Sequence, residues 1–203
     1  MKKFTSLILC ILLVLTIFSG CSNNEEKINF IYPFGGKINS YDPQVASTAD
    51  EFMLIENTFE GLVRVNDDGT VQKGVAESWS IDDDSLTYTF KLRKGVKWRI
   101  NDAIIERMGE DFDPDITAHD FVFALRRGAQ PETQAPLFST IACIKNASAI
   151  NKGEMSSEYL GVVAKDDYTL VITLETPNEE FMSTLATAIA MPCNQQFFEG
   201  TNG

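Results

Sequence analysis

Two stretches in which apolar residues recur at every second position constrain the fold of this chain more than any other feature. Residues 86–92 read Leu-Thr-Tyr-Thr-Phe-Lys-Leu, and residues 168–174 read Tyr-Thr-Leu-Val-Ile-Thr-Leu. Because successive side chains of a strand point to opposite faces, each stretch has one apolar face, as half-buried antiparallel strands do. Asp166 and Asp167 supply turn chemistry that would pair the second stretch with residues 161–163.

Helical patterns accompany these strands. Apolar residues recur at helical spacing in residues 51–62. Thr117 and Thr176 each precede an apolar helical run and have an acid three residues later, which is the pattern of a helix N-cap. Pro177 adds the proline that favours a first helical position. The sequence therefore predicts a mixed α/β (α+β) fold.

The connecting segments are read from their turn residues. Asn-Asp-Asp-Gly at 66–69 predicts a hairpin turn, and residues 28–31 are predicted to form the first strand. Residues 101–115 are acidic and irregular, so we expect a surface insertion there. Residues 199–203 read as loop with no helix to end on, as if the chain were interrupted.

The first twenty residues have the pattern of a secretory signal. Lys2 and Lys3 precede an apolar run over 7–18, and the small pair Ser-Gly at 19–20 leads directly to Cys21. The run is shorter than the roughly 20 residues that span a membrane. We therefore expect residues 1–20 to be removed and Cys21 to carry a lipid. An ordinary cleaved signal with a chance cysteine is the alternative.

The segment after Cys21 and the overall charge fit an exported protein. Residues 21–27 are polar and non-periodic after the cysteine, as expected of a tether between a lipid anchor and a domain. The chain has 29 acidic against 17 basic side chains, a formal net charge of −12. This surface should not attract nucleic acid or anionic lipid.

Two cysteines remain beyond the anchor, Cys143 and Cys193. In an extracytoplasmic setting they can form a disulfide, or they can be two free buried thiols. The sequence leaves both alternatives open.

The sequence contains no constellation typical of an enzyme. His119 is the single histidine, and no zinc, calcium-loop, nucleophile-elbow or phosphate-loop motif is present. His119 should lie on the surface in the first turn of its helix, and nothing places it beside Cys143. We expect no catalysis, no metal site and no cofactor.

Longer motifs resemble one family. Residues 74–79 (Gly-Val-Ala-Glu-Ser-Trp), 86–98 and 116–127 resemble the extracytoplasmic oligopeptide-binding proteins of ABC importers, bacterial solute-binding protein family 5. The resemblance includes Asp42-Pro43 and residues 59–62 upstream, and downstream it includes residues 144–147, 160–162, 166–170 and 176–177. The chain departs from the family at 99–115, where members commonly have a short turn.

The resemblance implies a periplasmic-binding-protein-like fold of two lobes that close over a ligand. Residues 28–59 would form the first segment of lobe I, residues 60–191 an αβ subdomain, and residues 192–203 a return to lobe I, while the opposite lobe is encoded later in family members. The protein would be monomeric and non-enzymatic, anchored on the extracytoplasmic face of the membrane, and would pass its peptide ligand to a permease. Other solutes (a dipeptide, an oligosaccharide, a nickel chelate) and a role in adhesion or signalling are the alternatives.

The resemblance also implies ligand contacts. One wall of the cleft pairs its backbone with the bound peptide. An ungapped match with the family over the stretch from Asp42-Pro43 to residues 59–61 places this wall on Ser47, Thr48 and Ala49. Leu137 matches a position where members often have an aromatic side chain beside the ligand, so it could provide an apolar contact.

Overall fold

The computed structural model describes residues 35–201, which belong to one compact unit. The predicted signal, Cys21, the tether and the predicted strand at 28–31 lie outside these residues. Within the described part of the chain, no helix has both the length and the apolarity needed to cross a membrane.

The two alternating stretches are antiparallel strands, as predicted, and the structure pairs them with each other at the centre of a four-stranded sheet. Its order is β3 (Ala76–Ile81), β4 (Thr87–Leu92), β6 (Thr169–Thr173) and β5 (Val162–Asp166). In the β4–β6 pair, Tyr88 lies opposite Ile172 and Phe90 opposite Leu170. These four side chains are buried, so they form one apolar face across the middle of the sheet.

A smaller hairpin precedes this sheet. β1 (Val63–Val65) pairs with β2 (Val71–Lys73), which confirms the turn predicted at 66–69. Gly74 follows β2 at a close approach between backbones, because a Cβ there would meet the carbonyl oxygens of Gly61 and Leu62. The glycine therefore allows the chain to pass directly over residues 61–62.

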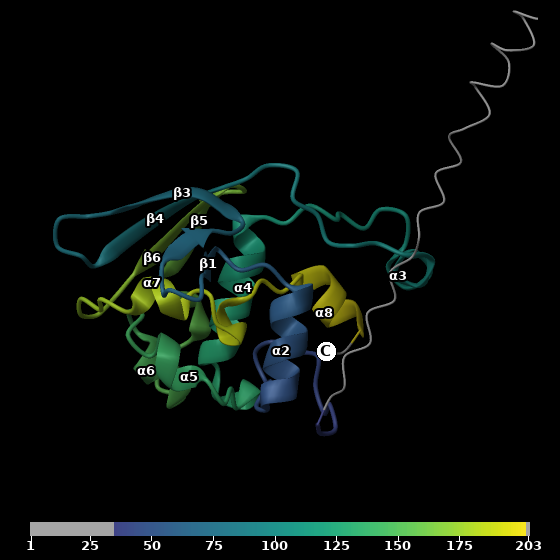
Figure 1. The fold of residues 1–203 in the computed structure, drawn as a ribbon, viewed down its shortest axis with the longest axis horizontal. Coiled ribbons are helices and arrows are strands. Elements are labelled where there is room, and N and C mark those ends of the chain that lie inside the picture. Colours follow the sequence, from purple (N-terminus) through teal and green to yellow (C-terminus); the bar gives the residue numbers. More distant parts are fainter. Residues whose placement is uncertain (1–34, 202–203) are drawn as a thin grey trace, which may run out of the picture. The chain divides into compact units, whose positions relative to one another are not determined.

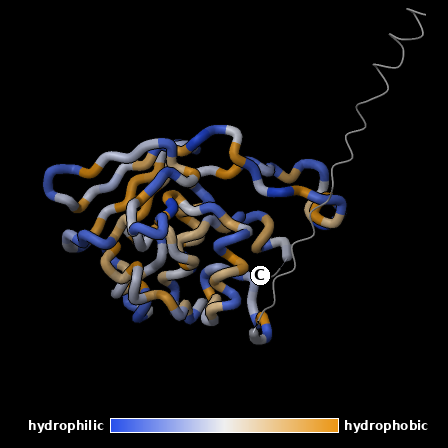
Figure 2. The backbone as a smooth tube through the Cα atoms, in the orientation of Figure 1, coloured by the Kyte–Doolittle hydropathy of each residue, from blue (hydrophilic) through white to orange (hydrophobic). Residues whose placement is uncertain are grey.

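Helix α4 (Ala118–Ala129) packs against the sheet (Figure 1). Its start is the predicted one, since Thr117 and Asp120 form a capping box in which the Asp120 carboxylate accepts the Thr117 N–H at 2.7 Å. Phe121 and Leu125 on its inner face are fully buried in the main core. Figure 2 shows the apolar stretches inside the fold and hydrophilic residues in the loop between β3 and β4.

The remaining helices are short. They are α2 (Ala49–Thr58), α3 (Asp102–Met108), α5 (Phe138–Ile141), α6 (Ala147–Asn151), α7 (Phe181–Thr184) and α8 (Gln195–Thr201), with 3-10 turns at Pro131–Thr133, Ser157–Tyr159 and Ala188–Ala190. The helix predicted at 51–62 ends at Thr58, because Phe59 is extended and residues 59–62 lead into β1. The helix predicted after Thr176 begins only at Phe181 and stops at Thr184.

Two segments that were predicted to be irregular contain helices. The insertion at 101–115 contains α3, whose N-cap Asn101 accepts the N–H of Ile104 at 3.0 Å. The predicted terminal loop is helical through Thr201, because Asn194 accepts the N–H of Phe197 at 2.8 Å and starts α8. α3 packs on α8, and neither helix had an apolar repeat long enough to be recognised alone.

Candidate functional site

The predicted wall lies at the start of α2. Ser47 and Ala49 are exposed, and Thr48 is the N-cap of the helix with extended backbone angles (φ −114°, ψ 155°). Ala49 is the first residue of α2, so its N–H has no acceptor within the helix. The wall therefore combines one residue with extended angles, Thr48, with an open helix N-terminus at Ala49.

The buried carboxylate of Glu51 holds this segment in place by accepting hydrogen bonds from its backbone. Oε2 accepts the N–H groups of Ser47 (2.8 Å) and Thr48 (3.1 Å), while Oε1 accepts those of Asn39 (2.8 Å) and Ser40 (3.2 Å). Glu51 is only 1% exposed. One buried carboxylate thus joins the wall to a second stretch of chain.

The hydrogen bonds to Glu51 favour its charged form. They lower the pKa of Glu51 to about 2, with the Ser47 N–H as the largest cause and burial acting in the opposite direction. Thr48 completes a capping box by accepting the Glu51 N–H at 3.3 Å. The carboxylate is therefore ionised throughout the ordinary pH range.

Leu137 lies near the wall without contacting the two cavities described below. It is half-buried, stands at the N-cap of α5, and packs against a small apolar cluster that includes Ala46, Ile55 and Met191. Since Ala46 precedes Ser47 directly, Leu137 and the wall share this cluster as a support.

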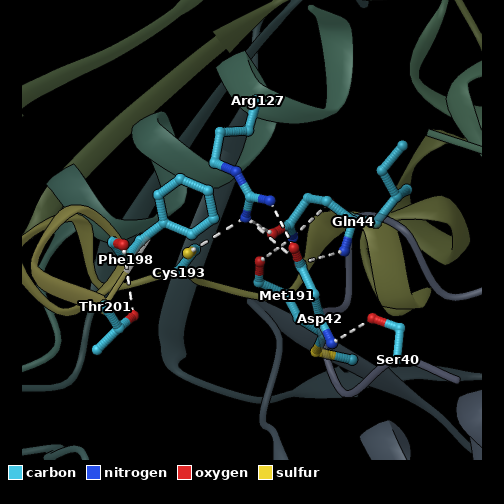
Figure 3. A network of polar contacts seen from close by, with 9 residues as sticks. Ser40, Asp42, Gln44, Arg127, Met191, Cys193, Phe198 and Thr201 are labelled. Atoms are coloured by element: carbon cyan, nitrogen blue, oxygen red, sulfur yellow. Dashed lines mark hydrogen bonds and ion pairs between the residues drawn. The ribbon is translucent and has the colours of Figure 1, made fainter. Parts of the chain in front are cut away.

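A second polar centre surrounds Arg127 on α4 (Figure 3). Its Nη1 donates to Gln44 Oε1 (2.9 Å) and lies 3.4 Å from the sulfur of Cys193. Its Nη2 donates to Asp42 Oδ2 (2.5 Å). The Phe198 ring covers the guanidinium, with 3.8 Å from Cζ to the ring centroid. Arg127 thus connects α4 with residues 42–44 and the segment that leads into α8.

Gln44 extends this centre toward the segment before Cys193. Its Nε2 donates to the carbonyl oxygens of Met191 (3.0 Å) and Ile189 (3.3 Å), and Gln44 is 1% exposed. Its own N–H donates to Asp42 Oδ1 at 3.0 Å. The turn ahead of the wall is therefore fixed by tertiary hydrogen bonds.

Burial and charge act against each other at this centre. Burial alone would lower the pKa of Arg127, but the hydrogen bonds and the charge of Asp42 outweigh it, so the pKa is raised. Burial raises the pKa of the Cys193 thiol to about 11, although Arg127 opposes this. The guanidinium stays charged and the thiol stays protonated.

Two hollows adjoin Arg127. One is a largely apolar cavity of about 340 Å³, whose lining includes Phe59, Trp98, Phe112 and Phe197. The other is an open groove that borders Tyr41, Phe123 and Glu132. Ser47, Thr48, Ala49 and Leu137 line neither hollow.

The other sequence-predicted residues are placed as follows. Cys143 and Cys193 are free in the structure, and both are half-buried and not fully buried. His119 is exposed on α4, as predicted, with Nε2 at 3.5 Å from Asp167. Among residues 35–201, no group of three His, Cys, Asp or Glu residues could hold a metal ion.

Sequence reasoning missed Glu51 and Arg127 as organising residues. Thr48-x-x-Glu51 is a capping-box pattern ahead of an apolar run, so a local signal for Glu51 existed. Arg127 carried a weaker signal, since it is a charged residue in a helical stretch, 118–129, whose sequence is otherwise mostly apolar.

Comparison with known proteins agrees with the fold and with the resemblance in sequence. The sequence model of the bacterial extracellular solute-binding proteins, family 5 (middle region), matches residues 70–202. The periplasmic oligopeptide-binding protein OppA of Haemophilus influenzae is 37% identical over 155 residues, which are 75% of this chain and 26% of that protein. The probable deoxycholate-binding periplasmic protein YgiS of Escherichia coli is 37% identical over 153 residues, 74% of this chain and 26% of that protein.

A solved structure supports the same assignment. Listeria monocytogenes OppA bound to peptide superposes with a TM-score of 0.70 at 32% identity, over 79% of this chain and 29% of that one. The mixed α/β fold of this binding-protein class is thereby confirmed. This chain spans between a quarter and a third of the length of each of these relatives. It belongs to the bacterial extracellular solute-binding proteins of family 5.

Proposed function

We propose that the whole protein captures oligopeptides outside the cytoplasm and passes them to the permease of an ABC importer, without catalysis. The likeness to a peptide-bound OppA at a TM-score of 0.70 supports this, as does the oligopeptide-binding relative at 37% identity. The family to which the chain belongs is described as extracellular and solute-binding.

The observation that carries the proposal is the unused backbone of the wall. The Ala49 N–H has no acceptor within α2, and no described residue donates to the Ser47 carbonyl oxygen. These two groups are a donor and an acceptor two residues apart. An extended peptide can pair with such an edge through its own backbone, whatever its side chains are.

The proposed setting is the outer face of the cell membrane. Lys2, Lys3, the apolar run and Cys21 support a cleaved signal and a lipid anchor, followed by a tether over residues 22–27. Residues 28–59, 60–191 and 192–203 are proposed as the lobe I segment, the αβ subdomain and the return to lobe I. The protein acts as a monomer.

A second ligand class has one observation in its favour. The YgiS relative, named as a probable deoxycholate-binding protein, is as similar in sequence as the oligopeptide-binding one. A ligand of that kind has no peptide backbone and cannot pair with the wall in the same way. Calorimetry with deoxycholate beside a peptide separates the two.

Ala49→Pro is a sharp test of the proposal. Proline removes the N–H at position 49 but suits the first residue of a helix, and Thr48 already has the extended angles that a following proline requires. We expect titration calorimetry of the whole protein to show binding of penta-alanine, weakened about tenfold by the substitution, the equivalent of roughly 1.4 kcal/mol.

Ala49→Gly is the matched control, since it keeps the N–H and should stay within about threefold of wild type. Binding of deoxycholate but not of penta-alanine by the wild-type protein would contradict the proposal.

A further inference from the structure

Glu51 lies beneath the proposed wall without reaching its outer surface. Its carboxylate accepts four backbone N–H groups, two of them from wall residues, and the side chain is almost completely buried. A capping box needs only one N–H bond to such a glutamate. The additional bonds indicate a role beyond starting α2.

Because the peptide bonds of the wall are planar, these hydrogen bonds also fix the direction of the backbone carbonyls in the wall. Every peptide bond in the described chain is trans, so the C=O of one residue and the N–H of the next point in opposite directions. Because the Thr48 N–H is directed at Oε2, the Ser47 carbonyl is directed away from Glu51. In the same way, the hydrogen bond from the Ser47 N–H to Oε2 directs the Ala46 carbonyl away from Glu51.

The carbonyls that Glu51 orients in this way are free within the described chain. No residue in 35–201 donates a hydrogen bond to the carbonyl oxygen of Ala46 or of Ser47. Ser47 is exposed and Ala46 is 1% exposed, so Ser47 is the residue that a ligand can reach. Its carbonyl is an acceptor that suits a ligand with N–H donors.

We infer that Glu51 is a positioning residue for peptide capture, holding the Ser47 carbonyl outward so that it accepts an N–H of the bound peptide. Glu51 touches no ligand and acts through the two peptide planes that it fixes. This inference rests on the proposed function. It adds the residue that fixes the conformation of the wall, Glu51, and the ligand group that the wall binds, a backbone N–H of the peptide.

Glu51→Gln tests this with little change in shape. A glutamine offers one acceptor oxygen and one NH₂ donor group, so one of the two pairs of backbone N–H groups must face a donor. With the whole protein, we expect about tenfold weaker binding of penta-alanine by calorimetry.

Asp120→Asn is the matched control, because it damages the other capping box, on α4, without touching the wall. It should leave the affinity within about twofold of wild type even though it lowers the melting temperature.

Depsipeptides provide a readout that general destabilisation would not change. A series of penta-alanine analogues, each with one backbone N–H replaced by an ester oxygen, should contain one position that weakens binding to wild type several-fold. The same analogue should bind Glu51→Gln no worse than penta-alanine does, since that contact is already lost.

If Glu51→Gln does not fold, Glu51→Asp replaces it. The shorter carboxylate keeps its charge but reaches only one of the two N–H pairs, and a loss of at least threefold is expected. Wild-type affinity in a folded Glu51 variant would overturn the inference while leaving the proposed function standing. No binding of penta-alanine by the wild-type protein would overturn both.

Discussion

Arg127 Nη2 lies 2.5 Å from Oδ2 of Asp42, a residue 85 positions earlier in the chain. The Arg127 side chain is 9% exposed and that of Asp42 is 27% exposed, so the ion pair is largely shielded from water. It ties α4 to the turn that leads into the proposed wall. The geometry of the wall therefore depends on a contact outside the wall.

Arg127→Ala should destabilise the protein strongly. It leaves the half-buried Asp42 carboxylate without its cation and the Gln44 side-chain oxygen without a donor. Because loss of one partner of a fully buried ion pair costs about 3 kcal/mol or more, we expect a loss of about 2 kcal/mol for this partly exposed pair. Urea denaturation measures this free energy. Arg127→Lys should recover only part of the loss, because lysine lacks the planar fork that reaches both residues.

The neighbouring Arg126→Lys is the control for Arg127. Arg126 is half-buried and donates one hydrogen bond to the Glu158 carbonyl, so its replacement by lysine should cost less than about 1 kcal/mol. Equal losses at the two arginines would show that the Asp42 contact has no special weight.

Glu51 should make stability depend on acid pH. Its pKa in the folded protein is about 2 against an ordinary value of 4.5. The stabilisation is therefore complete above about pH 4.5 and is lost as the pH falls toward 2. Unfolding free energy measured between pH 5 and pH 2 should decline more steeply in wild type than in Glu51→Gln. If the unfolding free energies of wild type and Glu51→Gln declined in parallel, the pKa of Glu51 would not be lowered in the folded protein.

Cys193 should resist alkylation. With a pKa of about 11, roughly one thiol in a thousand is ionised at pH 8, and the thiolate is the reactive form. We expect iodoacetamide to label Cys193 slowly at pH 8 in the native protein and faster as the pH rises toward 11. Rapid labelling at pH 8 would contradict burial of this thiol.

The state of the two cysteines can be read in samples of the same protein that were not alkylated. Mass spectrometry of the protein unfolded without reductant should find Cys143 and Cys193 both as free thiols. A peptide linked through the two would show that the disulfide alternative is the correct one.

Gly74→Ala should destabilise the fold through its backbone contacts. The added methyl group would meet the carbonyl oxygens of Gly61 and Leu62, which cannot move without shifting the β1–β2 hairpin. We expect a loss of about 2 kcal/mol or more in urea denaturation. Gly200→Ala is the contrast, since there the methyl group meets only the flexible end of Met108 and the change should be within about 0.5 kcal/mol.

The features predicted correctly from sequence are those with local signals. The alternation at 86–92 and 168–174 identified the two central strands, and Asn-Asp-Asp-Gly identified the β1–β2 turn. Thr117 identified the start of α4 because an N-cap and its acid lie within one turn of helix.

The features that could not be predicted depend on tertiary contacts. α3 and α8 have seven residues each and pack on one another, so neither carries a strong periodic signal. The contacts of Arg127 with Asp42 and Gln44 join residues more than eighty positions apart. At the wall, Thr48-x-x-Glu51 was visible in the sequence, but the bonds from Asn39 and Ser40 require the folded loop.

Peptide capture is tested by mass spectrometry of the ligands that co-purify with the whole protein. We expect peptides several residues long that penta-alanine displaces, together with a raised melting temperature when a peptide mixture is added. A preparation that contains no peptide and shows no thermal shift with the mixture would contradict peptide capture.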